Sequence, residues 1–332
     1  MFWTSWILAV LAIALAWPVP IVLSHAKWPS RSPFAAMVLW QAIALAGGLS
    51  MIGAMLAYGL DPLGPTFLAG LHALANVALN NRSADDVGIW HLFALSAAAL
   101  LLTHLLFTLL LTYVRIVSRR RRHRELLALL SSPGASTART LVINHPAPVA
   151  YCLPGGARSV TVLSDGLLEL LSENELQAVL EHEKTHLSQR HDLLLWAFAA
   201  WKFALPWLPT SRLAQQSVNV LIEMLADDAA LKRVQPPVLV RAIAMVSSGS
   251  SRVAPSDHGK RPPLSLPTPS ELNQLVAGSN NGEEASVTLS RIQRLIQPLG
   301  PLSALARRTV ICAAVLLLAA PTALILVPGL VG

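Results

Sequence analysis

The chain has 332 residues, of which 54% are hydrophobic and only 13% are charged, and its mean hydropathy is +0.54. This composition excludes a water-soluble protein of this length and indicates that a large part of the chain lies in a membrane. The net charge of +7 alone would be compatible with a nucleic-acid partner. Whether such a partner is expected depends on where the charges lie in the chain. Two cysteines, Cys152 and Cys312, are too few for a disulfide framework, and both thiols are expected to be reduced.

Residues 1–118 are predicted to form three transmembrane helices. The apolar runs Phe2–Leu23, Phe34–Leu60 and Trp90–Val117 are each long enough to span a bilayer. The first run is interpreted as a retained span and not as a signal peptide, because no Lys or Arg precedes it. An outer loop, residues 61–88, joins the second span to the third, and the sequence leaves open whether it senses a signal or only tethers the spans.

A fourth transmembrane helix is predicted in residues 310–332, and the basic residues orient all four spans. The run Arg119–Arg124 follows the third span directly, and of the 25 Lys and Arg only Arg82 falls on the opposite side. Basic loops stay in the cytoplasm, so both termini are expected outside the plasma membrane and the segment between the third and fourth spans inside. The basic run has no aromatic or groove-reading context, so no direct binding of nucleic acid is expected.

The cytoplasmic segment is predicted to begin with a domain of helices and strands, residues 119–246. Three short β-type runs, two of them joined by a turn at Pro154, are expected to form a small twisted sheet over a longer helix. A capping box of Ser172 and Glu175 marks the start of that helix. The three runs are Thr140–Ile143, Val149–Leu153 and Ser159–Leu163.

The helix carries the sequence HEKTH at residues 182–186, which has the HExxH pattern of zinc peptidases. Residues four apart lie on one face of a helix, so the imidazoles of His182 and His186 can bind the same ion. Glu183 lies one step round the helix, where its carboxylate can act as a general base on a water without binding the metal.

A later helical stretch, Asn219–Lys232, is predicted to supply the third ligand. Glu223 and Asp227 are four residues apart and share a face. Glu223 can complete a His, His, Glu site for Zn²⁺, and Asp227 can accept a hydrogen bond from the free ring N–H of a ligating histidine. The alternative is a non-catalytic receptor in which zinc only holds helices together, and such a site has no use for Glu183.

Three more segments are predicted from composition. Leu193–Leu205 is almost entirely apolar but short for a span, so it is expected to be buried or to dip into the membrane. Residues 247–284 are rich in Ser, Pro and Gly and are interpreted as a flexible linker; the sequence leaves open whether the linker holds a substrate or is cleaved by the protein itself. Residues 285–309 contain a basic amphipathic helix with Arg291 and Arg294, which suits the inner leaflet before the fourth span.

An HExxH helix followed by a separate helix with the pattern ExxAD, here Glu223 to Asp227, resembles the gluzincin metallopeptidases. The flanking sequence is similar to the membrane-integrated BlaR/MecR family over Leu141–Arg241. The resemblance implies a multi-span α-helical membrane protein with a cytoplasmic α+β zincin-like peptidase domain that binds Zn²⁺. It also implies that an edge strand of the sheet pairs with an extended substrate, and that the substrate is a cytosolic BlaI-like repressor, a winged-helix DNA-binding dimer.

The chain is expected to depart from that family by lacking an extracellular penicillin-binding sensor domain. The SxxK sequence at Ser24–Lys27 is attributed to chance, so a signal is expected to enter through the spans, the outer loop or a partner. A membrane quality-control protease of the HtpX/Ste type is the alternative enzyme. Tyr151, His191 and Arg241 are open candidates for the donor that stabilises the oxyanion, and the sequence leaves homo-oligomerisation open.

Overall fold

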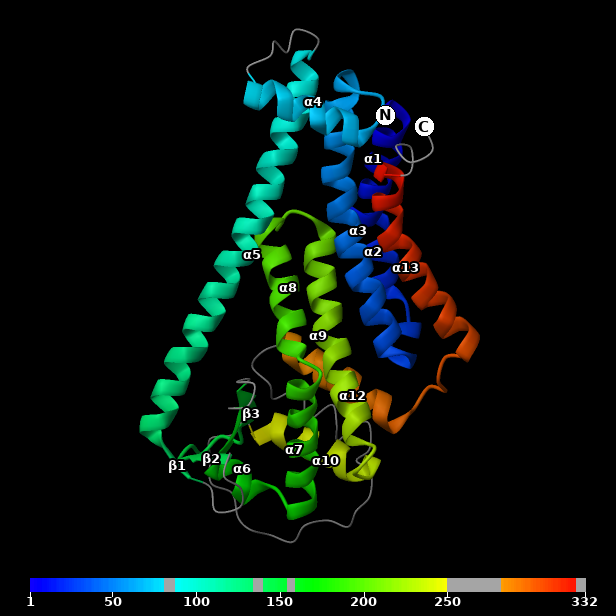
Figure 1. The fold of residues 1–332 in the computed structure, drawn as a ribbon. Coiled ribbons are helices and arrows are strands. Elements are labelled where there is room, and N and C mark those ends of the chain that lie inside the picture. The colour runs from blue at the N-terminus through cyan, green and yellow to red at the C-terminus, as the bar shows by residue number, and fades with distance from the viewer. Residues whose placement is uncertain (81–86, 134–139, 154–158, 250–281, 327–332) are drawn as a thin grey trace. The chain divides into compact units, whose positions relative to one another are not determined.

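The structure of the protein, a computed structural model, describes residues 1–80, 87–133, 140–153, 159–249 and 282–326 (Figure 1). Its internal contacts divide the chain into two units. Unit 1 consists of Met1–Tyr113, Ala197–Val218 and Leu302–Gly332, and unit 2 consists of Val114–Trp196 and Asn219–Pro301. The sheet and all the residues predicted to bind or surround the metal belong to unit 2.

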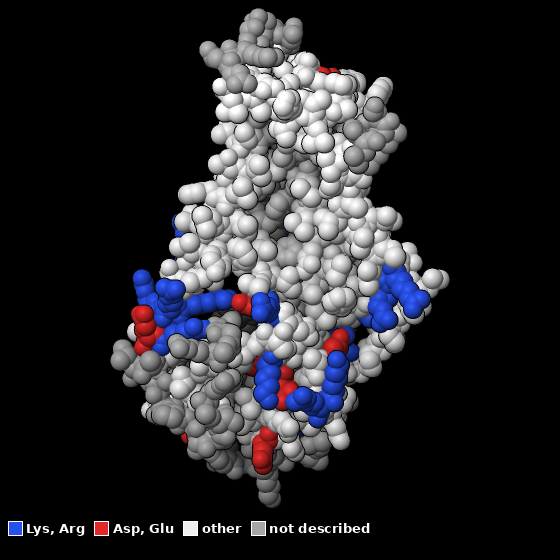
Figure 2. All heavy atoms as spheres, in the orientation of Figure 1, with Lys and Arg blue, Asp and Glu red and all other residues white. Residues whose placement is uncertain are grey.

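Four helices among the described residues are long and apolar enough to cross a membrane, which confirms the predicted number of spans. On the face drawn in Figure 2, charged side chains are sparse over these spans. The first span is divided at Trp17, because the residue before a proline is disfavoured in the helical conformation. The spans are α1 (Phe2–Ala16) with α2 (Pro18–His25), α3 (Pro33–Leu60), α5 (Ile89–Leu130) and α13 (Ala304–Leu326).

Helices α1 and α13 both pack against α3 in unit 1 (Figure 1). The approach is close because α3 has glycines at the contacts. A Cβ atom on Gly53 would lie 2.8 Å from the side chain of Ile325 in α13. Small residues of this kind let helix backbones come together where no hydrophobic effect drives the association.

Unit 1 also contains α4 (Phe67–Asn80) and the second half of α8 (His191–Ala204). Leu205 and Leu208, which follow α8, are buried in a cluster that includes Leu101 of α5. The C-terminal end of this apolar stretch is therefore buried against a helix that is itself a candidate membrane span, which is consistent with both predicted alternatives.

Unit 2 contains a four-stranded sheet with the order β1-β2-β4-β3. β2 and β4 are parallel, whereas β1 with β2 and β3 with β4 are antiparallel. The three predicted strands are present with bounds shifted by at most one residue, and β1 was missed because Ser-Ser-Pro has no apolar alternation. The strands are β1 (Ser131–Pro133), β2 (Thr140–Ile143), β3 (Ala150–Leu153) and β4 (Val160–Ser164).

The helices of unit 2 enclose a second core. α7, α10 and α12 pack together around Ala178, Val240 and Ile292, all fully buried. α10 has no counterpart among the predicted elements; residues 236–246 lie in the predicted domain and residues 247–249 in the predicted linker. The helices that lie wholly in unit 2 are α6 (Asp165–Leu170), α7 (Glu173–Ser188), α10 (Pro236–Gly249) and α12 (Gly282–Ile296).

α9 (Pro209–Ala230) is one helix of 22 residues and begins well before the predicted start at Asn219. Its first half looks polar in sequence, yet Val218 is fully buried and Thr210 donates a hydrogen bond of 2.9 Å to the carbonyl of Leu15. These contacts belong to unit 1, whereas the half from Asn219 onwards belongs to unit 2. Tertiary contacts therefore stabilise a helical segment that the local pattern did not indicate.

Most of the predicted linker, residues 247–284, lies outside the described residues, but both of its ends are helical. α10 continues to Gly249 and α12 begins at Gly282. The arginines of α12 make contacts that the sequence did not indicate. Arg291 and Arg294 form ion pairs with Asp227 and Asp228 of α9.

A substitution at Gly166, the second residue of α6, tests the packing of unit 2. Its N–H donates to the carbonyl of His145 at 3.1 Å, and a Cβ atom there would collide with the carbonyl of Pro146. We expect Gly166→Ala to lower the free energy of unfolding by about 1–3 kcal/mol, measured by thermal unfolding of the full-length protein in detergent. Gly300→Ala is the control, because its added methyl group would meet no atom within 4 Å; equal stability of the two variants would contradict the packing described.

Candidate metal centre

The N-terminus of α7 is held by the predicted capping box. The backbone N–H of Ser172 donates to Oε2 of Glu175 at 2.8 Å, and the Ser172 hydroxyl donates to the same oxygen at 2.7 Å. The other oxygen of Glu175 lies 3.1 Å from Nε of Arg241 in α10. Arg241 therefore contacts the beginning of α7, about 12 Å along the helix from Glu183, and this contact removes it from the candidates for the oxyanion donor.

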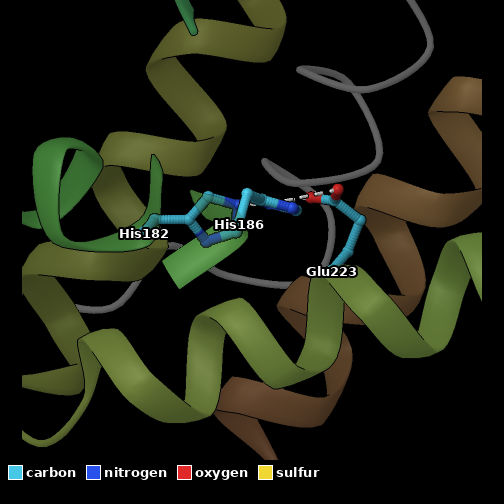
Figure 3. A group of neighbouring side chains, drawn as sticks. All are labelled: His182, His186 and Glu223. Atoms are coloured by element: carbon cyan, nitrogen blue, oxygen red, sulfur yellow. Dashed lines mark hydrogen bonds and ion pairs between the residues drawn. The ribbon is translucent and has the colours of Figure 1, made fainter. Parts of the chain in front are cut away.

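The structure brings His182 and His186 of α7 together with Glu223 of α9 (Figure 3). The two Nε2 atoms are 3.2 Å apart. Nε2 of His182 lies 3.3 Å from Oε2 of Glu223, and Nε2 of His186 lies 3.5 Å from Oε1. Figure 3 shows both imidazoles and the carboxylate pointing toward one another. Residues 37 and 41 positions apart in sequence thus present their donor atoms to a single point.

The two imidazole nitrogens are spaced as ligands of a tetrahedral zinc ion would be. Zinc binds imidazole nitrogen and carboxylate oxygen at roughly 2.0–2.2 Å, so adjacent ligands of a tetrahedral ion are about 3.3–3.5 Å apart. The two Nε2 atoms are 3.2 Å apart, whereas their contacts of 3.3 and 3.5 Å with Glu223 run to different oxygens; with one oxygen of Glu223, the three ligand atoms lie within 4.8 Å of one another. Two neutral nitrogens and one carboxylate also form the donor set of a catalytic zinc site, which keeps a fourth position open.

Asp227 lies beside the outer nitrogen of His182. Its Oδ1 atom is 3.0 Å from Nδ1 of His182, and its side chain is only 1% exposed. This hydrogen bond directs the Nε2 lone pair of His182 away from Asp227 and toward Glu223, the orientation that a metal ligand needs. Asp227 therefore occupies the place predicted for it, on the same face of α9 as Glu223.

His191 takes the corresponding place beside His186, although the sequence suggested a different role for it. The two Nδ1 atoms are 3.1 Å apart, and Nε2 of His191 is 2.9 Å from Oε1 of Gln189. If His191 donates its Nε2–H to Gln189, its Nδ1 accepts the Nδ1–H of His186, and Nε2 of His186 is left free to bind a metal. Arg190, with φ of 50°, makes the turn that folds His191 back, a backbone feature that the sequence did not indicate.

Arg291 of α12 is a second residue that the sequence did not connect with the site. It forms ion pairs with both Glu223 and Asp227, at 2.9 and 2.7 Å, and lies 3.5 Å from Nδ1 of His182. The sequence gave no signal for this contact, because Arg291 is more than 60 residues from Glu223 and lies in a helix interpreted as a membrane-surface element.

Glu183 is half-buried beside the ligands and contacts the sheet. Its carboxylate forms a hydrogen bond with the backbone of Cys152 in β3. Burial raises the pKa of Glu183 to about 7, with the charges of His182 and Arg291 acting in the opposite direction. A carboxylate with a pKa near 7 can both accept and donate a proton at neutral pH.

The pKa values of the ligands describe the site in its metal-free form. Burial acts to lower the pKa of His182, but the hydrogen bonds with Asp227 and Glu223 outweigh it and raise the pKa to about 9. Burial lowers the pKa of His186 to about 4. Burial acts to raise the pKa of Glu223, but the hydrogen bond with His182 and the charge of Arg291 lower it to about 2. Without a metal, a proton on His182 therefore provides positive charge between two carboxylates.

The remaining oxyanion candidate, Tyr151, lies in β3 next to Cys152. Its hydroxyl is 2.8 Å from Nε2 of His123 near the end of α5, and burial raises its pKa. Of the three candidates, Tyr151 and His191 thus lie near residues of the site, and the contacts of His191 are used to orient His186.

A model of peptidase family M48 matches residues 116–216 of the chain. The matched segment contains the sheet and α7 with the HExxH motif, and it ends before Glu223 and Asp227. Members of this family are zinc metallopeptidases, so the match supports a zinc metallopeptidase here. No curated protein and no solved structure matched the chain.

We expect zinc binding to release at least one proton at pH 7.5. His182 has a pKa of about 9 without metal and is protonated at this pH, and a metal ligand must be deprotonated. Zinc affinity should therefore rise between pH 6 and 8. Titration calorimetry in buffers with different ionisation enthalpies measures the number of protons released, and zinc binding without proton release would contradict a protonated His182 in the metal-free site.

Proposed function

We propose that this protein is a membrane-embedded zinc endopeptidase that hydrolyses a peptide bond of a cytosolic protein. The observation that carries the proposal is the convergence of His182, His186 and Glu223 on one point, with Glu183 beside them. The match of residues 116–216 to peptidase family M48 supports the metallopeptidase chemistry, and the four apolar helices support the membrane location.

Each residue of the site has a different proposed role in peptide hydrolysis. Zinc, when bound, lowers the pKa of a water toward about 7 and polarises the carbonyl of the scissile bond. Glu183 accepts the proton of the attacking water and delivers it to the leaving amine. Asp227 and His191 hold the two imidazoles in the orientation that leaves each Nε2 free.

The strand β3 is proposed to bind the substrate. Among the described strands β3 pairs only with β4, so it lies at an edge of the sheet and has backbone groups available for another strand. It also packs against α7, and Cys152 within it contacts Glu183. A peptide added as a further strand would bind through its backbone and pass close to the catalytic carboxylate.

The substrate proposed from the resemblance to the BlaR/MecR family is a cytosolic BlaI-like repressor, whose cleavage would relay a signal. A quality-control protease of the HtpX/Ste type would use the same ligands on many misfolded membrane proteins. A zinc-stabilised receptor without activity would need no general base. These proposals differ in the number of substrates and in the role of Glu183, so experiments on Glu183 separate them.

Glu183→Gln is expected to leave the zinc content unchanged and to lower peptidase activity by at least about 100-fold, because a general base contributes roughly 10²–10⁴-fold to rate. Zinc is measured by elemental analysis of the purified protein, and activity by cleavage of cytosolic proteins in cells. Glu181→Gln is the control, since Glu181 pairs with Lys184 and Arg233 and not with the ligands. Full activity of the Glu183→Gln variant would refute the assigned base.

Proteomics of cells with the wild-type protein and with Glu183→Gln also identifies the substrate. One protein cut at one bond supports the signalling proposal, and accumulation of many membrane proteins in the variant supports quality control. If the two proteomes are identical and zinc is present in both proteins, the receptor without activity is the remaining proposal.

The proposed orientation places the segment between α5 and α13 in the cytoplasm. It follows from the basic residues, since only Arg82 lies on the other side of the spans. In a variant without Cys152 and Cys312, a membrane-impermeant maleimide should label His72→Cys in intact cells, and Glu173→Cys only after lysis. Labelling of Glu173→Cys in intact cells would show that the proposed orientation is wrong.

A further inference from the structure

Arg291 connects α12 to two carboxylates of the candidate metal centre. Its Nε donates to Oδ2 of Asp227 at 2.9 Å and its Nη2 donates to Oδ1 at 2.7 Å, so the guanidinium binds this carboxylate with two parallel hydrogen bonds. Its Nη1 lies 2.9 Å from Oε2 of Glu223. Arg291 is 12% exposed and Asp227 is 1% exposed, so the contact between them is almost free of competing water, whereas the side chain of Glu223 is 30% exposed.

The geometry of the guanidinium relates the two carboxylates to each other. Its five N–H groups lie in one rigid plane, so a side chain that binds Asp227 through two of them and Glu223 through a third fixes the separation and tilt of both. Asp227 orients His182, and Glu223 faces His182 and His186. Arg291 thus restrains the predicted ligand Glu223 directly, and it restrains the predicted ligand His182 through Asp227.

The positive charge of Arg291 opposes metal binding, whereas its positioning of the ligands favours it. A cation close to Glu223 repels a divalent metal and shares the carboxylate with it. On the other hand, Glu183, Glu223 and Asp227 bring three carboxylates into one buried region, and with Arg291 their formal charge is −2, which a divalent ion would neutralise. Buried carboxylates that lose their cationic partner tend to change position or to bind a proton. Removing Arg291 would therefore raise metal affinity if charge repulsion dominates, and would lower it if the positioning of the carboxylates dominates.

We propose that Arg291 is a positioning residue of the metal centre, and that α12 is therefore a structural part of the peptidase site. This inference rests on the proposed function, because it assumes that His182, His186 and Glu223 bind zinc. It extends the site to a helix outside the segment that matches the peptidase family, residues 116–216. The segments that build the site thus lie on both sides of residues 250–281.

Arg294 supplies a matched comparison on the same pair of helices. It lies one turn after Arg291 in α12, and its Nη2 is 2.8 Å from Oδ1 of Asp228, the residue after Asp227. Asp228 is 38% exposed, and within the described residues its ion pair is with Arg294, whereas the ion pairs of His182 and His186 are with Glu223 and Asp227. If both arginines only anchored α12 to α9, their removal would have similar effects on the metal.

The test compares Arg291→Met, Arg291→Lys and Arg294→Met in the full-length protein in detergent. Zinc affinity is measured by competition with a chromogenic chelator, and ligand geometry by the visible spectrum of the Co²⁺-substituted protein. We expect Arg291→Met to weaken zinc binding by roughly 10–100-fold, the usual effect of losing a residue that orients metal ligands. Arg291→Lys should also weaken it, because an ammonium keeps the charge but cannot bind Asp227 through two parallel bonds. Arg294→Met should bind zinc like the wild-type protein.

Three outcomes would overturn the inference. Tighter zinc binding by Arg291→Met would show that charge repulsion dominates, and equal weakening by Arg291→Met and Arg294→Met would show that both arginines only anchor the helix. Thermal unfolding without metal shows whether each variant folds. If Arg291→Met does not fold, the zinc affinity of Arg291→Lys tests the inference. A wild-type protein that binds no zinc would refute the proposed function, whereas normal zinc binding by both Arg291 variants would refute only this inference.

Discussion

The buried charges between α7 and α9 are the constraint on which the site depends. Glu223 and Asp227 face the same way from one helix because they are four residues apart; Asp227 is 1% exposed and Glu223 is 30% exposed, and both contact His182 of α7. Buried carboxylates are tolerated only when cations or hydrogen-bond donors surround them. Here His182 and Arg291 provide these donors. The low pKa values of both acids and the raised pKa of His182 are consequences of that arrangement.

The orientation of the two histidines shows how the surrounding residues shape a metal site. Each imidazole has one nitrogen directed at Glu223 and the other held by a different residue, Asp227 for His182 and His191 for His186. These partners come from different helices and different local structures, a regular helix face in one case and a tight turn at Arg190 in the other. The common result is that the two Nε2 atoms lie 3.2 Å apart and both face Glu223.

Much of the fold could be predicted because the signals are local. The four spans follow from apolar length, the strands β2, β3 and β4 from short β-branched runs between turn residues, and the start of α7 from the pair Ser172 and Glu175. The errors occurred where distant contacts decide the conformation. The first half of α9 is helical in spite of its polar sequence, because Thr210 and Val218 pack in unit 1. The contacts of Arg291 in α12 were not predicted, because a basic helix face has the same sequence pattern whether it meets lipid or protein carboxylates.

The sequence by itself determined which residue types could bind and use zinc, since HExxH and the pair Glu223 and Asp227 each place their side chains on one face of a helix. That result needs only the helical repeat. Tertiary structure alone decided that the two helices meet, that His191 and not Arg241 lies beside the ligands, and that Arg291 enters the site from α12. The physical reason is that helix periodicity is a property of neighbouring residues, whereas the pairing of buried charges depends on segments that lie far apart in the chain.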